Sequence, residues 1–227
     1  MGQMIDHISD EQRQQLQKLA DEQKHAAAVK AKADKTKPVT DLIVQQRRNR
    51  FRGCDNKVRF QLPDAENTLK RGLVWALGDD ARWLPEYSKV AAWLGDNKGK
   101  GLLCMGDCGR GKTVITRDIL PELFSNYFHL AYNYTTAKRL KECFVEFSHY
   151  KILCIDDVGT ESKVRHYGNT TDYIEDIVDL CEQQDKLLIC STNLNTDQLL
   201  ERYDLRVVDR LKALCRQVIF EGESMRG

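Results

Sequence analysis

Five short apolar runs constrain the fold of this chain more than any other feature. Each run is separated from the next by sequence with helical character. This alternation is typical of an α/β domain in which a largely parallel sheet is covered by helices on both faces. We expect the strands at residues 101–106, 128–134, 151–156, 187–192 and 217–220.

The first part of the chain follows a different pattern. Ser9 and Gln12 form a capping box, which predicts a helix over residues 10–34 that ends before Pro38. The apolar stripe of this helix is too thin to bury a face. We therefore expect a helix that is solvated or that needs a partner.

A cluster of arginines follows the predicted N-terminal helix, with Arg47, Arg48, Arg50 and Arg52 around Phe51. It could track a phosphate backbone or form a solvated linker face. Residues 1–52 carry a net charge of +4 and the rest of the chain −3. We predict that residues 1–52 form a basic, largely helical extension for partner contact, and that any nucleic-acid contact is local.

Two helical patterns between residues 65 and 95 precede the first predicted strand. They predict a helical connector at 53–98 and an α/β domain at 99–227. Pro121 is expected to break or kink the helix after the first strand.

The eight cysteines include no CxxC pair, and Cys104, Cys154 and Cys190 lie inside apolar runs. We expect reduced, buried thiols. The chain has no run of eighteen apolar residues, and its first ten residues lack the features of a secretory signal. These observations predict a cytoplasmic protein without membrane contact.

The segment GDCGRGKT at residues 106–113 matches G-x-x-x-x-G-K-[ST], directly after a predicted strand and at the start of a helix. In such a loop, backbone N–H groups and the helix dipole face phosphate oxygens. Lys112 would neutralise the β- and γ-phosphates, and the Thr113 hydroxyl would bind Mg²⁺. The predicted nucleotide-binding residues are Gly106, Asp107, Cys108, Gly109, Arg110, Gly111, Lys112 and Thr113.

Polar residues follow two further predicted strands at the same carboxyl edge, where ligands bind in open α/β sheets. Asp156 is expected beside the metal. Asp157 could orient the attacking water or cap a loop. Asn193 could hold this water or a γ-phosphate oxygen, or it could be an ordinary turn residue.

Arg206 and Arg210 are one helical turn apart in residues 201–215, so both would leave the same helix face. They could supply an arginine finger to a neighbouring subunit. Salt bridges to Asp209 or Glu201 are the alternative.

The segments GLLCMGDCGRGKT, ILCIDDVGTE, ICSTNL, ERYDLRVVDRL and IFEGESMR occur in this order over residues 99–227. Together they resemble the AAA+ ATPases of the DnaC/IstB group, which includes bacterial replicative helicase loaders and transposition helper ATPases. The stretch YGNTTDYIEDIVDLC also resembles DnaC-like ATPases of phages and mobile elements.

The resemblance implies a role for each matching position. Asp156 and Asp157 match the Walker B acid pair, Asn193 matches sensor 1, Arg210 the finger and Arg226 sensor 2. It also implies a P-loop NTPase fold of the AAA+ type, with a five-stranded parallel sheet between helices and no C-terminal helical lid. A fifth predicted strand close to the end of the sequence agrees with this.

Two features depart from the family pattern. About sixteen residues, TTAKRLKECFVEFSHY, separate the second predicted strand from the Walker B run, where the family places longer helices that contact single-stranded DNA. Residues 1–52 also resemble no named module, whereas family loaders grip the helicase with their N-terminal domains.

The resemblance therefore implies an Mg²⁺-dependent ATPase that binds ATP and oligomerises through Arg210 in trans. Its expected partners are a replicative helicase, which it would load or remodel, and single-stranded DNA. One alternative is a transposition helper that partners a transposase. Another is a non-hydrolysing, nucleotide-gated adaptor, because Asp157 stands where many AAA+ enzymes have Glu. A small-molecule kinase would need an arginine-rich lid and an acceptor pocket, and the sequence shows neither.

Overall fold

The computed structural model describes residues 56–161, 164–166, 169–171 and 173–225. The described residues form one compact unit that begins at Asn56. The predicted helix at 10–34, the arginine cluster at 47–52 and Arg226 lie outside the described residues. Among the described helices, none has the length and apolar character needed to cross a membrane.

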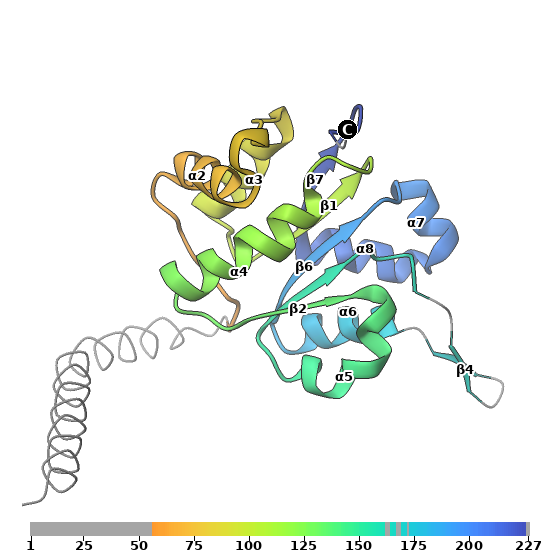
Figure 1. Ribbon diagram of the computed structural model, residues 1–227. Coiled ribbons are helices and arrows are strands. Elements are labelled where there is room, and N and C mark those ends of the chain that lie inside the picture. The colour runs from red at the N-terminus through yellow and green to blue at the C-terminus, as the bar shows by residue number, and fades with distance from the viewer. Residues whose placement is uncertain (1–55, 162–163, 167–168, 172, 226–227) are drawn as a thin grey trace, which may run out of the picture. The chain divides into compact units, whose positions relative to one another are not determined.

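A five-stranded sheet forms the centre of this unit, with the strand order β2-β3-β6-β1-β7 (Figure 1). All four neighbouring pairs are parallel, so the carboxyl ends of the strands meet at one edge. This confirms the predicted α/β fold class. The strands are β1 (Gly101–Gly106), β2 (Tyr132–Thr136), β3 (Ile152–Asp156), β6 (Leu187–Thr192) and β7 (Cys215–Phe220).

Two strands differ from their predicted bounds. The run at 128–134 becomes a strand only from Tyr132, because Phe128 and Leu130 still donate backbone hydrogen bonds to the preceding helix. The last strand begins earlier than predicted, at Cys215, which pairs with Gly101. Apolar character therefore located these strands but did not set their ends.

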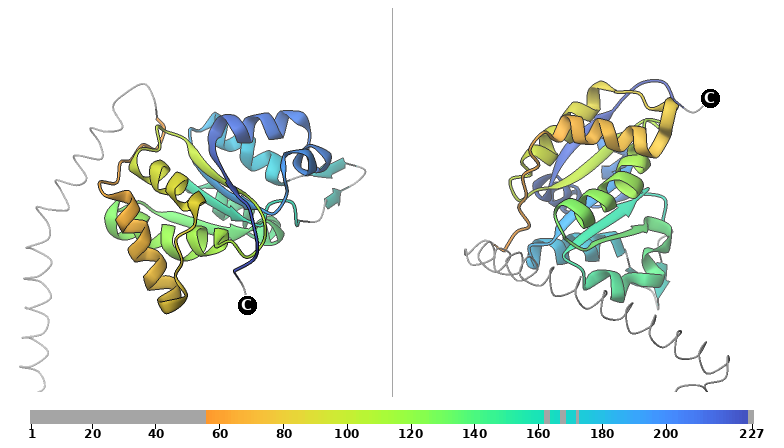
Figure 2. Two further views of the ribbon diagram at one scale, coloured as in Figure 1. Left: turned by 90° about the horizontal axis from the view of Figure 1, so that it is seen from above. Right: turned by 60° about the vertical axis from the view of Figure 1, so that its left-hand side comes forward.

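Side chains that alternate along β1 fill two separate cores, one on each face of the sheet. Leu102 and Cys104 belong to the first core, and Leu103 and Met105 to the second. Figure 2 shows the helices on both sides of the sheet from two further directions. Because helices cover both faces of the sheet, its strands are apolar on both sides, and their sequences read as continuous apolar runs.

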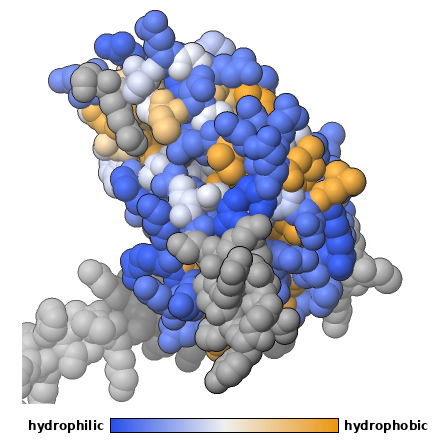
Figure 3. Space-filling model, turned by 90° about the vertical axis from the view of Figure 1, so that its right-hand side faces the viewer, coloured by the Kyte–Doolittle hydropathy of each residue, from blue (hydrophilic) through white to orange (hydrophobic). Residues whose placement is uncertain are grey.

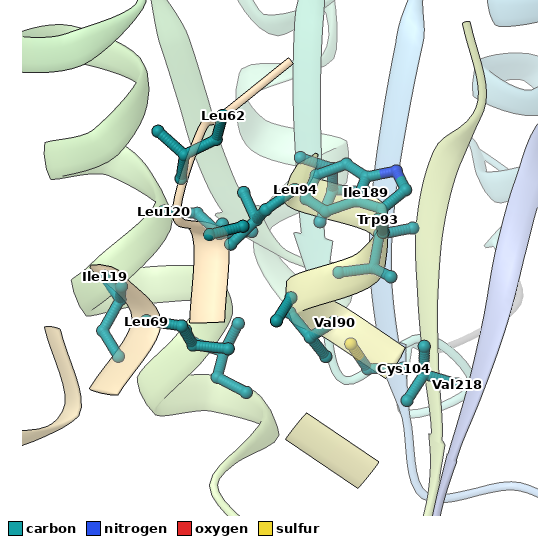
Figure 4. Packing of buried hydrophobic residues seen from close by; sticks show 14 of the residues in the cluster. Leu62, Leu69, Val90, Trp93, Leu94, Cys104, Ile119, Leu120, Ile189 and Val218 are labelled. Carbon is teal, nitrogen blue, oxygen red and sulfur yellow. The ribbon is translucent and has the colours of Figure 1, made fainter. Parts of the chain in front are cut away.

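The first core is covered by α2 (Ala65–Leu77) and α3 (Pro85–Gly95), which η1 (Gly78–Asp80) connects. These helices lie in the segment predicted to be a connector. In this core, Val90 and Trp93 of α3 lie near Cys104, whereas Leu69 of α2 lies near Ile119 (Figure 4). Buried Asn97 follows α3 and fixes the segment that precedes α2. Its side-chain amide donates to the Val58 carbonyl oxygen and accepts a hydrogen bond from the Phe60 N–H.

A continuous helical stretch after β1 completes the cover of the first core. It comprises η2 (Val114–Ile119), α4 (Leu120–Glu122) and η3 (Leu123–Tyr127). Pro121 does not end this stretch. The turns on either side are wider than in an α-helix, and the Leu120 N–H reaches back five residues to Ile115 O.

The second core is covered by α5 (Leu140–Ser148), which η4 (Ala137–Arg139) precedes, and by α6 (Tyr173–Gln183), α7 (Thr196–Arg202) and α8 (Leu205–Leu214). Between β3 and α6, the short strands β4 (Val164–His166) and β5 (Asn169–Thr171) form an antiparallel pair outside the main sheet. We did not predict this hairpin, because its strands have three residues each and no apolar run.

Replacement of Leu69 by alanine should lower the free energy of unfolding by about 2–5 kcal/mol, because it leaves a cavity at a position that is 0% exposed. The matched control on the same helix is Val74→Ala, at a position that is 58% exposed, and it should change stability by less than about 0.5 kcal/mol. Denaturant unfolding measures both. Equal effects of the two substitutions would contradict the packing of α2 described above.

Candidate functional site

The loop between β1 and the following helix lies at the carboxyl edge of the sheet. Gly109 and Gly111 have φ angles of 74° and 83°, a region that L side chains rarely adopt. A Cβ at Gly111 would lie 2.2 Å from the Tyr87 hydroxyl oxygen, and one at Gly109 would lie 2.0 Å from Ser224 Oγ. Both glycines are therefore required by backbone conformation and by close contact.

The Lys112 side chain folds back onto the start of this loop. Its Nζ donates to the carbonyl oxygens of Gly106, at 2.8 Å, and of Asp107, at 2.7 Å. The side chain is buried, and this burial lowers the pKa of Lys112. The ammonium is held by neutral carbonyls, so an anion that reached it would be strongly favoured.

Helix α3 braces the loop from behind. The Tyr87 hydroxyl donates to Arg110 O at 3.0 Å. The Arg110 guanidinium donates to buried Glu86 through Nε, at 2.9 Å, and lies 2.8 Å from the same carboxylate through Nη2. Burial raises the pKa of Tyr87 to about 12, which keeps this hydroxyl a donor. Arg110, predicted to bind nucleotide, thus has its side chain engaged with α3.

The segment after β7 also contacts the loop. The Asp107 N–H donates to Phe220 O, and the Gly222 N–H donates to an Asp107 carboxylate oxygen, both at 2.8 Å. The Met225 N–H donates to Gly109 O at 3.0 Å. The residues directly before Arg226 therefore lie against the phosphate loop.

The two neighbouring acids at the end of β3 have different surroundings. Asp156 is 2% exposed and accepts hydrogen bonds from the Tyr134 and Ser191 hydroxyls. Asp157 is half-buried and has a φ of 57°, and its N–H donates to Ser191 Oγ at 3.0 Å. The neighbouring acids therefore face different environments.

A cavity of about 710 Å³ is lined by some of the predicted residues, but not by Gly106, Asp107 or Arg110 of the loop. The size is within the range of small-molecule sites. Asp157 and Asn193 line it together with the loop residues Lys112 and Thr113, whereas Asp156 is buried and is not among the lining residues. Sequence reasoning missed the lining residues in and around η1, which are Leu77, Asp80 and Arg82. The remaining lining residues are Cys108, Gly109, Gly111, Val114 and Met225.

The oxygen groups at this edge suit Mg²⁺. Within the described residues, no group of three His, Cys, Asp or Glu side chains could hold a metal ion by itself. Mg²⁺ is usually bound by one or two carboxylates together with phosphates of the substrate. The Thr113 hydroxyl and the Asp157 carboxylate line the cavity and are oxygen groups of the kind that Mg²⁺ binds, and Asp156 is the adjacent buried acid.

Arg210 lies on α8, where it forms ion pairs with acids of α6. Its guanidinium contacts Asp179, and its Nε lies 2.9 Å from Glu182. Arg206 contacts Asp179 at 3.4 Å, so both arginines leave one helix face as predicted. The partners are on α6, not at Asp209 or Glu201 as the spacing suggested. The visible face on the α7 and α8 side is largely hydrophilic, with hydrophobic residues in small separate groups (Figure 3).

No protein-family model matches the chain, and no curated protein matches it. Among solved structures, the chain is similar to one described as DnaI, with 21% identity over 56% of this chain and 73% of that chain, at a TM-score of 0.46. A DnaC helicase loader has 19% identity over 71% and 93% of the two chains, at 0.44. Domain III of the Thermotoga maritima replication initiation protein DnaA has 19% identity over 71% and 65%, at 0.43.

The fold and the loop define an α/β P-loop protein.

The cysteines of the described residues are all free thiols, and Cys104, Cys154 and Cys190 are buried as predicted. Burial raises the pKa of Cys104 to about 12. At pH 8 only about one in ten thousand of such thiols is the reactive thiolate. Iodoacetamide at pH 8 should therefore alkylate exposed Cys108 in the folded protein, and the buried thiols only after denaturation.

Peptide mass spectrometry before and after addition of guanidinium chloride measures this difference. Labelling of Cys104 at the rate of Cys108 in the folded protein would contradict the burial of the β1 side chains.

Proposed function

We propose that this protein is an AAA+ ATPase that binds ATP with Mg²⁺ and loads or remodels a replicative helicase on single-stranded DNA. One observation carries the nucleotide part of the proposal. Lys112, Asp157 and Asn193, which come from three separate segments of the chain, line one cavity beside the glycine-rich loop.

The loop would bind the triphosphate with its backbone N–H groups. Lys112 would exchange the carbonyls of Gly106 and Asp107 for phosphate oxygens, which bear a full negative charge and therefore bind the ammonium more strongly. α3 and the segment after β7 would keep the loop open for this exchange, because they hold its outer side through Arg110 and Asp107.

Thr113 and Asp156 would hold the metal. When bound, Mg²⁺ would neutralise charge on the β- and γ-phosphates. Asp157 and Asn193 line the cavity and would orient the attacking water, which is the main task of the protein in phosphoryl transfer. Asp157 is one methylene shorter than Glu, and this favours a non-hydrolysing adaptor as the second candidate function.

Arg210 would act in trans, on the nucleotide of a neighbouring copy. In the single chain its guanidinium is engaged with Asp179 and Glu182. The triphosphate of a neighbour would have to replace these carboxylates. Assembly and nucleotide binding would therefore be coupled through the opening of this ion pair.

The partner part of the proposal rests on the motifs that resemble helicase loaders. Residues 1–52 carry the excess positive charge of the chain and would contact the helicase, and the Arg47–Arg52 cluster would contact single-stranded DNA. The described domain would supply the nucleotide-dependent change that makes this contact reversible.

Replacement of Lys112 by alanine should weaken ATP binding about 30-fold or more. The variant loses the ammonium that would pair with the phosphates, and removal of one member of a buried charged pair costs about 2 kcal/mol or more of binding free energy. Isothermal titration calorimetry measures this change. Lys89→Ala, on the exposed side of α3, is the control and should bind like the wild type. Unchanged affinity in the Lys112 variant would contradict the phosphate site.

Replacement of Arg210 by alanine should lower ATP turnover about 10³-fold or more without loss of ATP binding, because a finger supplied in trans acts on the transition state. Arg206→Ala is the matched control one turn away, with a side chain that is 63% exposed. Phosphate release at several protein concentrations measures turnover. Equal ATP turnover of the Arg210 variant and the wild type would contradict the role of Arg210 as an arginine finger.

The client is identified by pull-down with a purified replicative helicase and a purified transposase, each with and without ATP. The proposal expects capture of the helicase that changes with the nucleotide. Nucleotide-dependent capture of the transposase alone would establish the transposition helper instead. Phosphate release with and without single-stranded DNA distinguishes an ATPase from a non-hydrolysing adaptor.

A further inference from the structure

Two hydroxyl groups from neighbouring strands fix the carboxylate of Asp156. The Tyr134 hydroxyl, on β2, donates to Oδ2 at 3.0 Å, and the Ser191 hydroxyl, on β6, donates to Oδ1. β3, which carries Asp156, lies between these two strands. The carboxylate is therefore held from both sides, each oxygen by a different strand.

Ser191 also holds the turn at Asp157. Its Oγ accepts the Asp157 N–H at 3.0 Å, and its carbonyl oxygen accepts the Val158 N–H at 2.8 Å. Thr192, the next residue of β6, donates from its hydroxyl to Val158 O at 2.6 Å. These bonds connect the end of β6 to the turn after β3.

This connection stabilises an unfavourable backbone conformation. Asp157 is not glycine, yet its φ is 57°, a left-handed conformation that costs roughly 1–2 kcal/mol for an L-residue. The Asp157 side chain lines the cavity in this conformation. Ser191 is 0% exposed, so bulk solvent does not reach its hydroxyl to compete for either bond.

We propose that Tyr134 and Ser191 are positioning residues of the nucleotide site, which fix the Asp156 carboxylate and, through Ser191, the Asp157 turn. This inference rests on the proposed function. A carboxylate has about four lone-pair sites, so two donors leave capacity for a further ligand. Partners of this kind fix the orientation of a metal-binding group, and their loss typically costs 10- to 100-fold in metal affinity or activity.

The variants Tyr134→Phe and Ser191→Ala each remove one hydroxyl and leave the rest of the side chain nearly unchanged. Their affinity for ATP is measured by calorimetry in excess Mg²⁺ and again in EDTA. We expect affinity in EDTA within about twofold of the wild type, because the loop and Lys112 are untouched. The gain in affinity that Mg²⁺ brings should fall about 10- to 100-fold.

Tyr132→Phe is the matched control. Tyr132 is on the same strand, but its hydroxyl donates to Thr116 O at 2.6 Å and not to an acid of the site. This variant should keep the Mg²⁺-dependent gain of the wild type. Thermal melts in the absence of nucleotide check that each variant is folded, and the two positioning variants lie on different strands, so that one is informative if the other is unstable.

A full Mg²⁺-dependent gain in both positioning variants would overturn the inference. A parallel loss of affinity in EDTA and in Mg²⁺ would also overturn it, because that result indicates general damage to the site. If the wild type itself binds ATP no better with Mg²⁺ than with EDTA, the proposed function fails, and the inference fails with it. The wild-type titration separates this case from failure of the positioning role alone.

Discussion

The parallel register of β1, β3 and β6 is the constraint on which the rest of the site depends. Met105 pairs with Thr192, and Ile155 pairs with Cys190, so β1 and β3 each end within about one residue of the end of β6. The phosphate loop, the acid pair and Asn193 follow directly from those ends. Because the strands are buried on both faces and rigidly paired, the polar residues after them have fixed positions relative to one another. Slippage of any one strand would move its polar residues away from the other two groups.

Further side-chain and backbone contacts then hold the site in shape. Glu86 and Tyr87 of α3 and the segment after β7 contact the outer side of the phosphate loop, while Tyr134 and Ser191 hold the acids. Apart from the exposed bond between Gly222 and Asp107, these contacts are made by partly or fully buried groups, for which water is a poor substitute. The loop and the acids are thus ordered before a nucleotide arrives, which reduces the entropy that binding costs.

The sequence predicts much of this arrangement, because strong local patterns encode it. The apolar runs located all five strands of the main sheet, and the residues after them identified Lys112, Asp157 and Asn193 as neighbours. The supporting contacts leave no such pattern. Tyr134 sits in an ordinary strand sequence and acquires its role only when β2 pairs with β3. Likewise, the partners of Arg210 come from α6, which is too far away in the sequence for a local pattern to reveal them. Only the packing of α6 on α8 brings these side chains together.

The central claim is that the loop and the residues after β3 and β6 form one site for a triphosphate and its metal. A crystal structure with Mg²⁺ and a non-hydrolysable ATP analogue tests it most directly. The account predicts that Lys112 Nζ leaves the carbonyls of Gly106 and Asp107 for the phosphates, with Asp157 and Asn193 facing the γ-phosphate. A nucleotide bound elsewhere, or one that leaves Lys112 on those carbonyls, would contradict the account.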